Sequence, residues 1–232
     1  MSLFRRPSRR DDPARRFQNR LVRQAASLLL AYPDEHLPDR LGTVDALIGH
    51  IDDPERGRLT RTASYLRGSS LLDAAQAYVD TFDLRRRSTM YLTYWTAGDT
   101  RNRGSEIHAF VQTYREAGAE PPVDEAPDHL PVVLEFAATV APEAGERLLV
   151  AHRVPIDVLH QALVGDDSPY ADTIAAVCAT LPPVDEAQEQ RARQLMHAGP
   201  PAEAIGLQPF TLTVPPRRDP TTEGLHDRRE GR

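Results

Sequence analysis

The stretch from residue 130 to residue 140 reads Leu130-Pro131-Val132-Val133-Leu134-Glu135-Phe136-Ala137-Ala138-Thr139-Val140. When this stretch is wound as a helix, its apolar residues fall on nearly every side. A helix that is apolar all round is buried in the interior of a protein. The stretch therefore predicts a central helix against which the rest of the chain packs.

The sequence on both sides of this stretch is also helical in pattern. Apolar residues recur at spacings of three and four, as in helices with one buried face. Asp12-Pro13 and Asp53-Pro54 each offer an N-cap residue followed by proline at the first helical position. Neither an alternating strand pattern nor a fixed-period repeat emerges, so we expect an all-α fold, a single compact bundle of about nine or ten helices. The other apolar stripes lie at about residues 17–29, 41–51, 59–66, 71–82, 90–95, 107–114, 148–150, 158–163 and 174–181, and a polar helix is expected at 185–197.

Length and charge suggest how the chain is organised. Its 232 residues, 40% of them hydrophobic, can bury a core within one domain. Residues 1–23 hold eight Arg and two Asp, although the whole chain has a formal net charge of −6. A basic arm on an acidic body argues against a nucleic-acid partner, whose binding domain should itself be basic. We expect a disordered basic arm at 1–11, a helical domain at 12–200 and an extended to disordered tail at 201–232.

The sequence predicts a cytoplasmic protein without stable membrane association. No apolar run approaches the roughly 18–20 residues that span a bilayer. The pairs Arg5-Arg6, Arg9-Arg10 and Arg15-Arg16 resemble a twin-arginine export signal. Polar residues between Gln18 and Gln24 interrupt the apolar stretch that such a signal needs.

Familiar catalytic and metal-binding patterns are missing from the sequence. There is no nucleophile elbow, no His-Glu-x-x-His and no glycine-rich phosphate loop. The eight histidines include no pair four residues apart, and the single cysteine, Cys178, has the apolar neighbours of a core residue. We expect no catalytic and no metal-binding residues, and hence no enzyme.

Two polar segments need a separate explanation. The first is Gly98-Asp99-Thr100-Arg101-Asn102-Arg103-Gly104, whose arginines and helix N-terminus could hold an anion or a carboxylate. It could equally be a plain interhelical turn, in which Gly98 ends one helix and Asp99 or Thr100 caps the next.

The second segment is Asp128-His129-Leu130-Pro131, followed by Leu134-Glu135-Phe136. If a helix begins near Asp128, Glu135 lies two turns later on the same face, and the carboxylate pair with His129 could do acid–base chemistry. The alternative is a capped helix start with a hydrogen-bonded core histidine.

At these two segments the sequence resembles the nitrate reductase molybdenum cofactor assembly chaperones, a NarJ-like branch of the all-helical redox-enzyme maturation chaperones. Order and spacing agree over about residues 20–200. Four motifs carry the resemblance: Leu28-Leu29-Leu30-Ala31-Tyr32-Pro33-Asp34; Tyr78-Val79-Asp80-Thr81-Phe82-Asp83-Leu84 with Ser88; the Gly98–Gly104 segment; and Asp128-His129-Leu130-Pro131 with Leu134-Glu135-Phe136.

The resemblance implies a chaperone that binds the immature catalytic α subunit of the membrane nitrate reductase through its N-terminal peptide. It would keep that subunit competent for molybdenum cofactor insertion and delay membrane anchoring. It implies no stably bound cofactor, and it places molybdenum cofactor biosynthesis proteins among the partners. Family members often carry an acidic, aromatic-ended segment near the end of the domain. Here that region reads Gly199-Pro200-Pro201-Ala202-Glu203, which departs from the pattern.

A client helix would need an apolar groove, for which aromatic side chains with polar tips are suited. The same helical spacing also suits a plain core. Two other functions stay open: a helical metal-dependent hydrolase using Asp128, His129 and Glu135, and a generic helical adaptor. The candidate client-binding residues are Tyr78, Phe82, Tyr91, Tyr94, Asp99, Arg101, Arg103, Asp128, His129 and Glu135.

Overall fold

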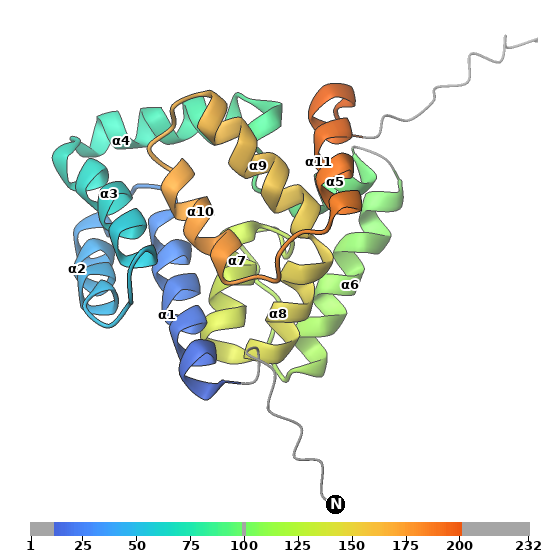
Figure 1. Ribbon diagram of the computed structural model, residues 1–232, viewed down its shortest axis with the longest axis horizontal. Coiled ribbons are helices and arrows are strands. Elements are labelled where there is room, and N and C mark those ends of the chain that lie inside the picture. Colours follow the sequence, from blue (N-terminus) through green and yellow to red (C-terminus); the bar gives the residue numbers. More distant parts are fainter. Residues whose placement is uncertain (1–11, 99–100, 201–232) are drawn as a thin grey trace, which may run out of the picture.

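The computed structural model describes residues 12–98 and 101–200, and this part of the chain is all-helical, as the sequence predicts. It forms a compact bundle with eleven α-helices in the described ranges (Figure 1). The predicted arm at 1–11 and tail at 201–232 lie outside the described residues and stay predictions. The α-helices are α1 (Pro13–Leu29), α2 (Leu37–Ile48), α3 (Glu55–Gly68), α4 (Leu71–Tyr78), α5 (Leu92–Ala97), α6 (Asn102–Glu116), α7 (Leu130–Glu135), α8 (Pro142–Ala151), α9 (Arg153–Gly165), α10 (Ala171–Ala179) and α11 (Glu186–Ala198); the shorter turns are η1 (Val79–Asp83), η2 (Arg86–Ser88) and η3 (Phe136–Val140).

The stretch 130–140 forms α7 and continues into the π-helical turn η3. Leu130, Leu134 and Ala137 are fully buried, whereas Glu135 and Thr139 reach solvent. The central position is confirmed, but burial on every side is not, because one edge of the helix lies at the surface. Helices α1 and α8 pack against α7 and η3.

Close approach explains a glycine in α8. A Cβ added at Gly145 would lie 2.8 Å from the backbone nitrogen of Ala137, and closer still to its Cα and Cβ. Real side chains do not reach such distances, so only glycine lets α8 lie this near to η3.

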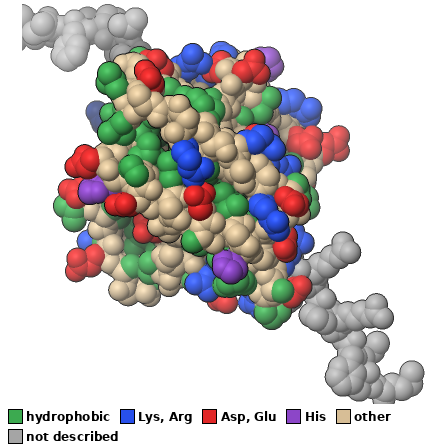
Figure 2. Space-filling view, turned by 90° about the vertical axis from the view of Figure 1, so that its left-hand side faces the viewer, with side chains coloured by type: hydrophobic (Ala, Val, Ile, Leu, Met, Phe, Trp, Pro, Cys, Tyr) green, Lys and Arg blue, Asp and Glu red, His purple; other side chains and the backbone are tan. Residues whose placement is uncertain are grey.

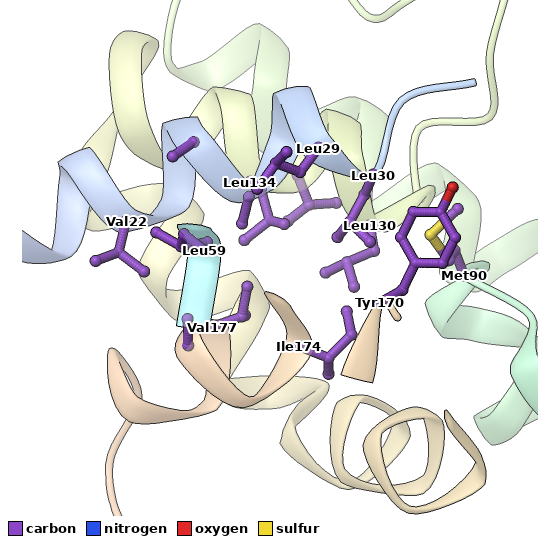
Figure 3. Packing of buried hydrophobic residues seen from close by; sticks show 14 of the residues in the cluster. Val22, Leu29, Leu30, Leu59, Met90, Leu130, Leu134, Tyr170, Ile174 and Val177 are labelled. Carbon is purple, nitrogen blue, oxygen red and sulfur yellow. The ribbon is translucent and has the colours of Figure 1, made fainter. Parts of the chain in front are cut away.

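Helix α1 begins as its sequence predicts. The amide of Ala14 donates to the Asp12 carboxylate at 3.0 Å, and Pro13 takes the first helical position. The helix crosses the middle of the bundle (Figure 1), where the Ser27 hydroxyl donates to the Pro131 carbonyl at 2.8 Å. Apolar residues from α1, α3, α7 and α10 meet there in the main core (Figure 3): Val22, Leu29, Leu30, Leu59, Leu130, Leu134, Ile174 and Val177.

Two predicted helix starts are wrong. The residue directly before α3 is Pro54, which has helical dihedral angles. No side chain caps this helix, so Asp53 is not its N-cap. Helix α5 begins at Leu92 and not at Met90, because Tyr91 is extended and pairs with His129 in an isolated antiparallel bridge.

The surface carries charges of both signs. On the face shown in Figure 2, acidic and basic side chains are interspersed among hydrophobic ones. Such a face is not typical of a nucleic-acid-binding surface, which is basic. Within residues 12–98 and 101–200, no helix is long and apolar enough to cross a membrane.

Candidate functional site

Two of the motif segments are joined by their backbones. The amide of Leu92 donates to the Asp128 carbonyl at 3.1 Å, and the amide of Leu130 donates to the Met90 carbonyl at 3.0 Å. These two bonds flank the bridge between Tyr91 and His129. They hold the first turns of α5 and α7 side by side.

The Asp128 carboxylate caps α5 and not its own helix. The side chain is fully buried, and its Oδ2 accepts hydrogen bonds from the Thr93 amide at 3.1 Å and the Thr93 hydroxyl at 2.6 Å. Thr93 is the second residue of α5, where backbone N–H groups have no partner within the helix. A helix does begin near Asp128, since α7 starts at Leu130 after His129, but Asp128 does not cap it.

Arg103 joins this buried network from α6. Its Nε donates to the Thr93 hydroxyl at 3.2 Å, and its Nη2 lies 3.9 Å from Asp128 Oδ2. Its guanidinium carbon lies 5.5 Å from the centre of the Tyr91 ring, within cation–π range. The sequence suggests that the arginines of this segment could hold an anion or a carboxylate, and the structure places Arg103 near the protein's own Asp128 carboxylate.

The rest of the polar turn is described only in part. Gly98 ends α5 with φ +62°, as predicted, and Arg101 is exposed just before α6. Asp99 and Thr100 lie outside the described residues, so their predicted capping role stays a prediction.

His129 stacks on Tyr91, with ring centres 5.0 Å apart and planes 31° from parallel. Both rings reach the same carboxylate: His129 Nδ1 lies 3.1 Å from Glu125 Oε2, and the Tyr91 hydroxyl donates to Glu125 Oε1 at 3.3 Å. Burial lowers the pKa of His129, and the charges of Glu125, Asp128 and Asp83 offset part of this effect. At neutral pH the ring is an uncharged stacking partner.

The first two motifs meet in an aromatic cluster. Tyr32 contacts Tyr78 edge-on with ring centres 5.3 Å apart, and Tyr78 and Phe82 pack on Tyr170 at 6.2 and 5.0 Å. Tyr78 and Phe82 are buried, whereas Tyr32 is 49% exposed. The structure thus places two of the candidate residues in the core, directly beneath an exposed tyrosine.

Tyr94 and Trp95 lie in a second, smaller cluster. Their rings pack edge-to-face at 5.9 Å, and both are buried against Val158 of α9 and Ala192 of α11. Tyr91 packs against the same cluster. This contact connects it to the Tyr91–His129 pair.

Burial raises the pKa of Tyr78 and of Tyr91, and the charges of Asp83 and Glu125 raise both further. Tyr91, Arg103 and Glu125 are partly exposed, and the buried ring of His129 stacks on Tyr91. We call the surface formed by Tyr91, Arg103 and Glu125, together with the His129 ring, the Tyr91 patch.

The constellation needed by a hydrolase is not assembled. Glu135 is exposed on α7, and Asp128 is buried on Thr93, so the expected carboxylate pair does not form. Across the part of the chain that the structure describes, no three His, Cys, Asp or Glu side chains are grouped to hold a metal ion. Cavities of about 380 and 550 Å³ open at the start of α1, and none of the described candidate residues lines them.

Sequence reasoning missed Thr93 and Glu125. Glu125 left a signal, because an acid four residues before a histidine can reach its ring. Thr93 left none, since its partner Asp128 is 35 positions away and nothing local marks the pairing.

The arrangement of helices is shared with a solved structure of a redox enzyme maturation protein from Archaeoglobus fulgidus. The TM-score is 0.53 at 23% identity, over 77% of this chain and 96% of that one. This likeness shows a common fold.

The family follows from the sequence comparisons. The model of the nitrate reductase delta subunit family matches residues 50–176, more than half of the chain. The chain therefore belongs to the nitrate reductase delta subunit family, which confirms the resemblance drawn from the four motifs.

Named relatives agree with this family. The chain is 59% identical to the "Nitrate reductase-like protein NarX" of Mycobacterium tuberculosis over 160 residues, 69% of this chain and 24% of that protein. It is 34% identical to the "Probable nitrate reductase molybdenum cofactor assembly chaperone NarJ" of Bacillus subtilis over 158 residues, 68% of this chain and 86% of the relative. The chain thus spans only about a quarter of the NarX relative but most of the NarJ one.

Proposed function

We propose that this chain is a private cytoplasmic chaperone for the catalytic α subunit of respiratory nitrate reductase. It binds the N-terminal peptide of the immature subunit and keeps the subunit competent for molybdenum cofactor insertion before membrane anchoring. Family membership and the name of the Bacillus subtilis relative support this role. Molybdenum cofactor biosynthesis proteins are further partners, and the chaperone holds no cofactor stably.

The observation that carries the proposal is the convergence of the Gly98–Gly104 motif and the motif that begins at Asp128 on the Tyr91 patch. The patch offers the Tyr91 ring, stacked on His129, beside the carboxylate of Glu125. A peptide helix with apolar and basic side chains fits these groups, because the ring contacts the apolar face and the carboxylate pairs with a cation. The buried bonds of Asp128 to Thr93 hold the patch in place before the client arrives.

The burial of each candidate residue divides their roles. Tyr91 and Arg103 are partly exposed and would contact the client directly, together with exposed Arg101. Asp99 lies outside the described residues and stays a candidate for the same role. The buried candidates would position the patch without reaching the client: Tyr78, Phe82, Tyr94, Asp128 and His129. Glu135 is exposed, but among the described residues no hydrogen bond or ion pair joins its side chain to the patch.

Deleting the gene tests the function. We expect nitrate reductase subunits to be synthesised but inactive and poor in molybdenum cofactor, with activity restored by the wild-type gene. Normal activity in a clean deletion without a paralogue would overturn the proposal. A pulldown that recovered many unrelated proteins as strongly as nitrate reductase would favour a generic adaptor instead.

Titration with a synthetic N-terminal peptide of the α subunit tests the site. Tyr91→Ala should weaken binding by about 1–3 kcal/mol, since a central aromatic anchor carries much of a peptide's affinity. Phe17→Ala is the matched control, because Phe17 is an exposed aromatic residue on α1, a helix that does not form the patch. Equal affinities of the two variants for the peptide would show that the peptide binds elsewhere on the chaperone.

A further inference from the structure

Helix α11 packs mainly on α9, and few of its side chains are buried there. Only Ala192 of its thirteen residues is buried, and Leu195 and Met196 are half-buried beside it. Among the described residues, no hydrogen bond or ion pair joins a side chain of α11 to another helix; the ion pair between Arg193 and Glu189 lies within α11. Its attachment is therefore apolar.

The helix is capped by its own residues. The amide of Gln188 donates to the Asp185 carboxylate at 2.7 Å, and the amide of Asp185 donates to the Gln188 side chain at 3.1 Å. This reciprocal capping box satisfies backbone donors without help from the bundle. Helix α11 can therefore keep its N-terminal turn when it leaves its place.

Hydrogen bonds hold the chain in place up to Pro182, just before α11. Arg153 Nη1 donates to the carbonyls of Cys178 at 3.1 Å and Pro182 at 2.9 Å. Beyond Pro182 the next hydrogen bonds are those of the capping box. The connection at Pro183 and Val184 thus separates a segment held by hydrogen bonds from a helix held by apolar contacts.

The apolar contact of α11 is made with a small aromatic cluster. Helix α11 packs on α9 (Figure 1), and its Ala192 shares a cluster with Tyr94 and Trp95 of α5. The Trp95 indole N–H is buried and has no hydrogen-bond partner in the described part of the chain. An open cavity of about 250 Å³ lies between α9 and α11, lined by Asp157, Gln161, Glu189, Ala192 and Arg193.

This covered surface is continuous with the Tyr91 patch, because Tyr91 packs against the same small cluster as Tyr94 and Trp95. We propose that α11 is a displaceable cover that occupies part of the client-binding surface in the free chaperone. The proposal rests on the proposed function and adds its regulation: the client helix takes the place of α11.

The cover itself shows which partner fits. Ala192, Leu195 and Met196 lie at positions i, i+3 and i+4, a small residue followed one turn later by two large flexible ones. The partner is an amphipathic helix with the same order of small and large apolar residues. Larger side chains at the small position would fill the cavity beside Ala192.

The test displaces α11 in the full chain without touching the surface beneath it. Ala192→Glu places a charge in the apolar contact, and Ala187→Glu makes the same change on the exposed side of the same helix. Trp95, the single tryptophan of the chain, reports the result. Ala192→Glu should shift its emission to the red and speed hydrogen exchange in α11, whereas Ala187→Glu should match the wild type. Unchanged emission and exchange in Ala192→Glu would overturn the proposal.

A synthetic peptide of residues 185–198 tests whether the surface accepts a helix in trans. It should restore the wild-type emission of Ala192→Glu and leave Ala187→Glu unchanged. If the first variant aggregates, Met196→Ala should give a smaller red shift that the same peptide reverses. A red-shifted variant that ignores the peptide contradicts a helix-binding surface.

Client binding separates this inference from the proposed function. The α-subunit peptide should bind Ala192→Glu up to about tenfold more tightly than Ala187→Glu if α11 covers the surface about nine-tenths of the time. Equal affinities would overturn the cover but leave the proposed function standing. Failure of the α-subunit peptide to bind any variant would count against the proposed function alone, and the emission and trans-peptide results would then decide on the cover.

Discussion

Asp128 and Thr93 are 35 positions apart, yet one carboxylate oxygen of Asp128 accepts both the amide and the hydroxyl of Thr93. A helix N-terminus is usually capped by the residue just before it. Here the cap of α5 comes from the segment that leads into α7. One buried interaction therefore fixes the relative position of two helix starts and, with them, the Tyr91–His129 stack.

Removing this carboxylate should destabilise the fold. Asp128→Ala leaves the Thr93 amide and hydroxyl buried without their acceptor and Arg103 without its carboxylate. We expect a loss of about 3–5 kcal/mol in the free energy of unfolding, measured by urea titration. Arg103→Ala should cost only about 1–2 kcal/mol, because Arg103 is 26% exposed and 3.9 Å from Asp128. Equal losses in the two variants would show that the carboxylate has no special role as a cap.

Local pattern explains why so much of the fold could be predicted. Helical periodicity and the Asp12-Pro13 start depend on residues within one or two turns of each other, and both are confirmed. The Asp128 cap, the extended residue Tyr91 and the exposure of Glu135 depend on which segments meet in space. The motifs located the candidate site, but periodicity could not separate buried Tyr78 from half-exposed Tyr91, since both are aromatic residues at helical spacing.

Two glycine substitutions should have opposite effects. Gly145→Ala forces a methyl group into the backbone of Ala137 and should cost about 1–3 kcal/mol, the usual penalty for overpacking. Gly42→Ala is the matched control within α2, where an added Cβ meets nothing within 4 Å. It should stabilise the protein by about 0.5–1 kcal/mol, because alanine favours helix. Thermal melts of both variants check this, and a stabilised Gly145→Ala would contradict the tight crossing of α8 and η3.

The buried guanidinium of Arg23 should make Glu146 important for stability. Arg23 Nη2 lies 3.2 Å from Glu146 Oε2, and Nη2 and Nε also donate to the backbone oxygen and hydroxyl of Thr180. Glu146→Ala leaves a buried cation without its counter-charge. Because Glu146 is itself 42% exposed, we expect a moderate cost of about 1–3 kcal/mol. Glu143 is an exposed residue on the same helix. Glu143→Ala should change the free energy of unfolding, measured by chemical denaturation, by less than about 0.5 kcal/mol. Similar values for both glutamates would show that the pair contributes little.

Acid should destabilise the protein through its buried histidines. Burial lowers the pKa of His129, His152 and His160. Nearby carboxylates offset part of this effect, whereas Arg58 and Arg153 lower the pKa of His160 further. In the unfolded chain a histidine has its ordinary pKa of about 6.5. Between the two values the unfolded chain binds more protons, so stability falls as the pH drops. The contribution is therefore complete above about pH 6.5 and is lost as the pH falls through the folded pKa.

Urea unfolding of the wild type and His129→Asn at pH 7 and pH 5 tests how much of the loss of stability in acid comes from His129. The variant should lose less stability between the two pH values, whatever its absolute stability. Glu125→Gln should lose more, because Glu125 raises the pKa of His129, and its removal makes the folded ring still harder to protonate. Identical losses in the wild type and His129→Asn would place the acid sensitivity in other groups and leave the Tyr91–His129 stack without a part in it.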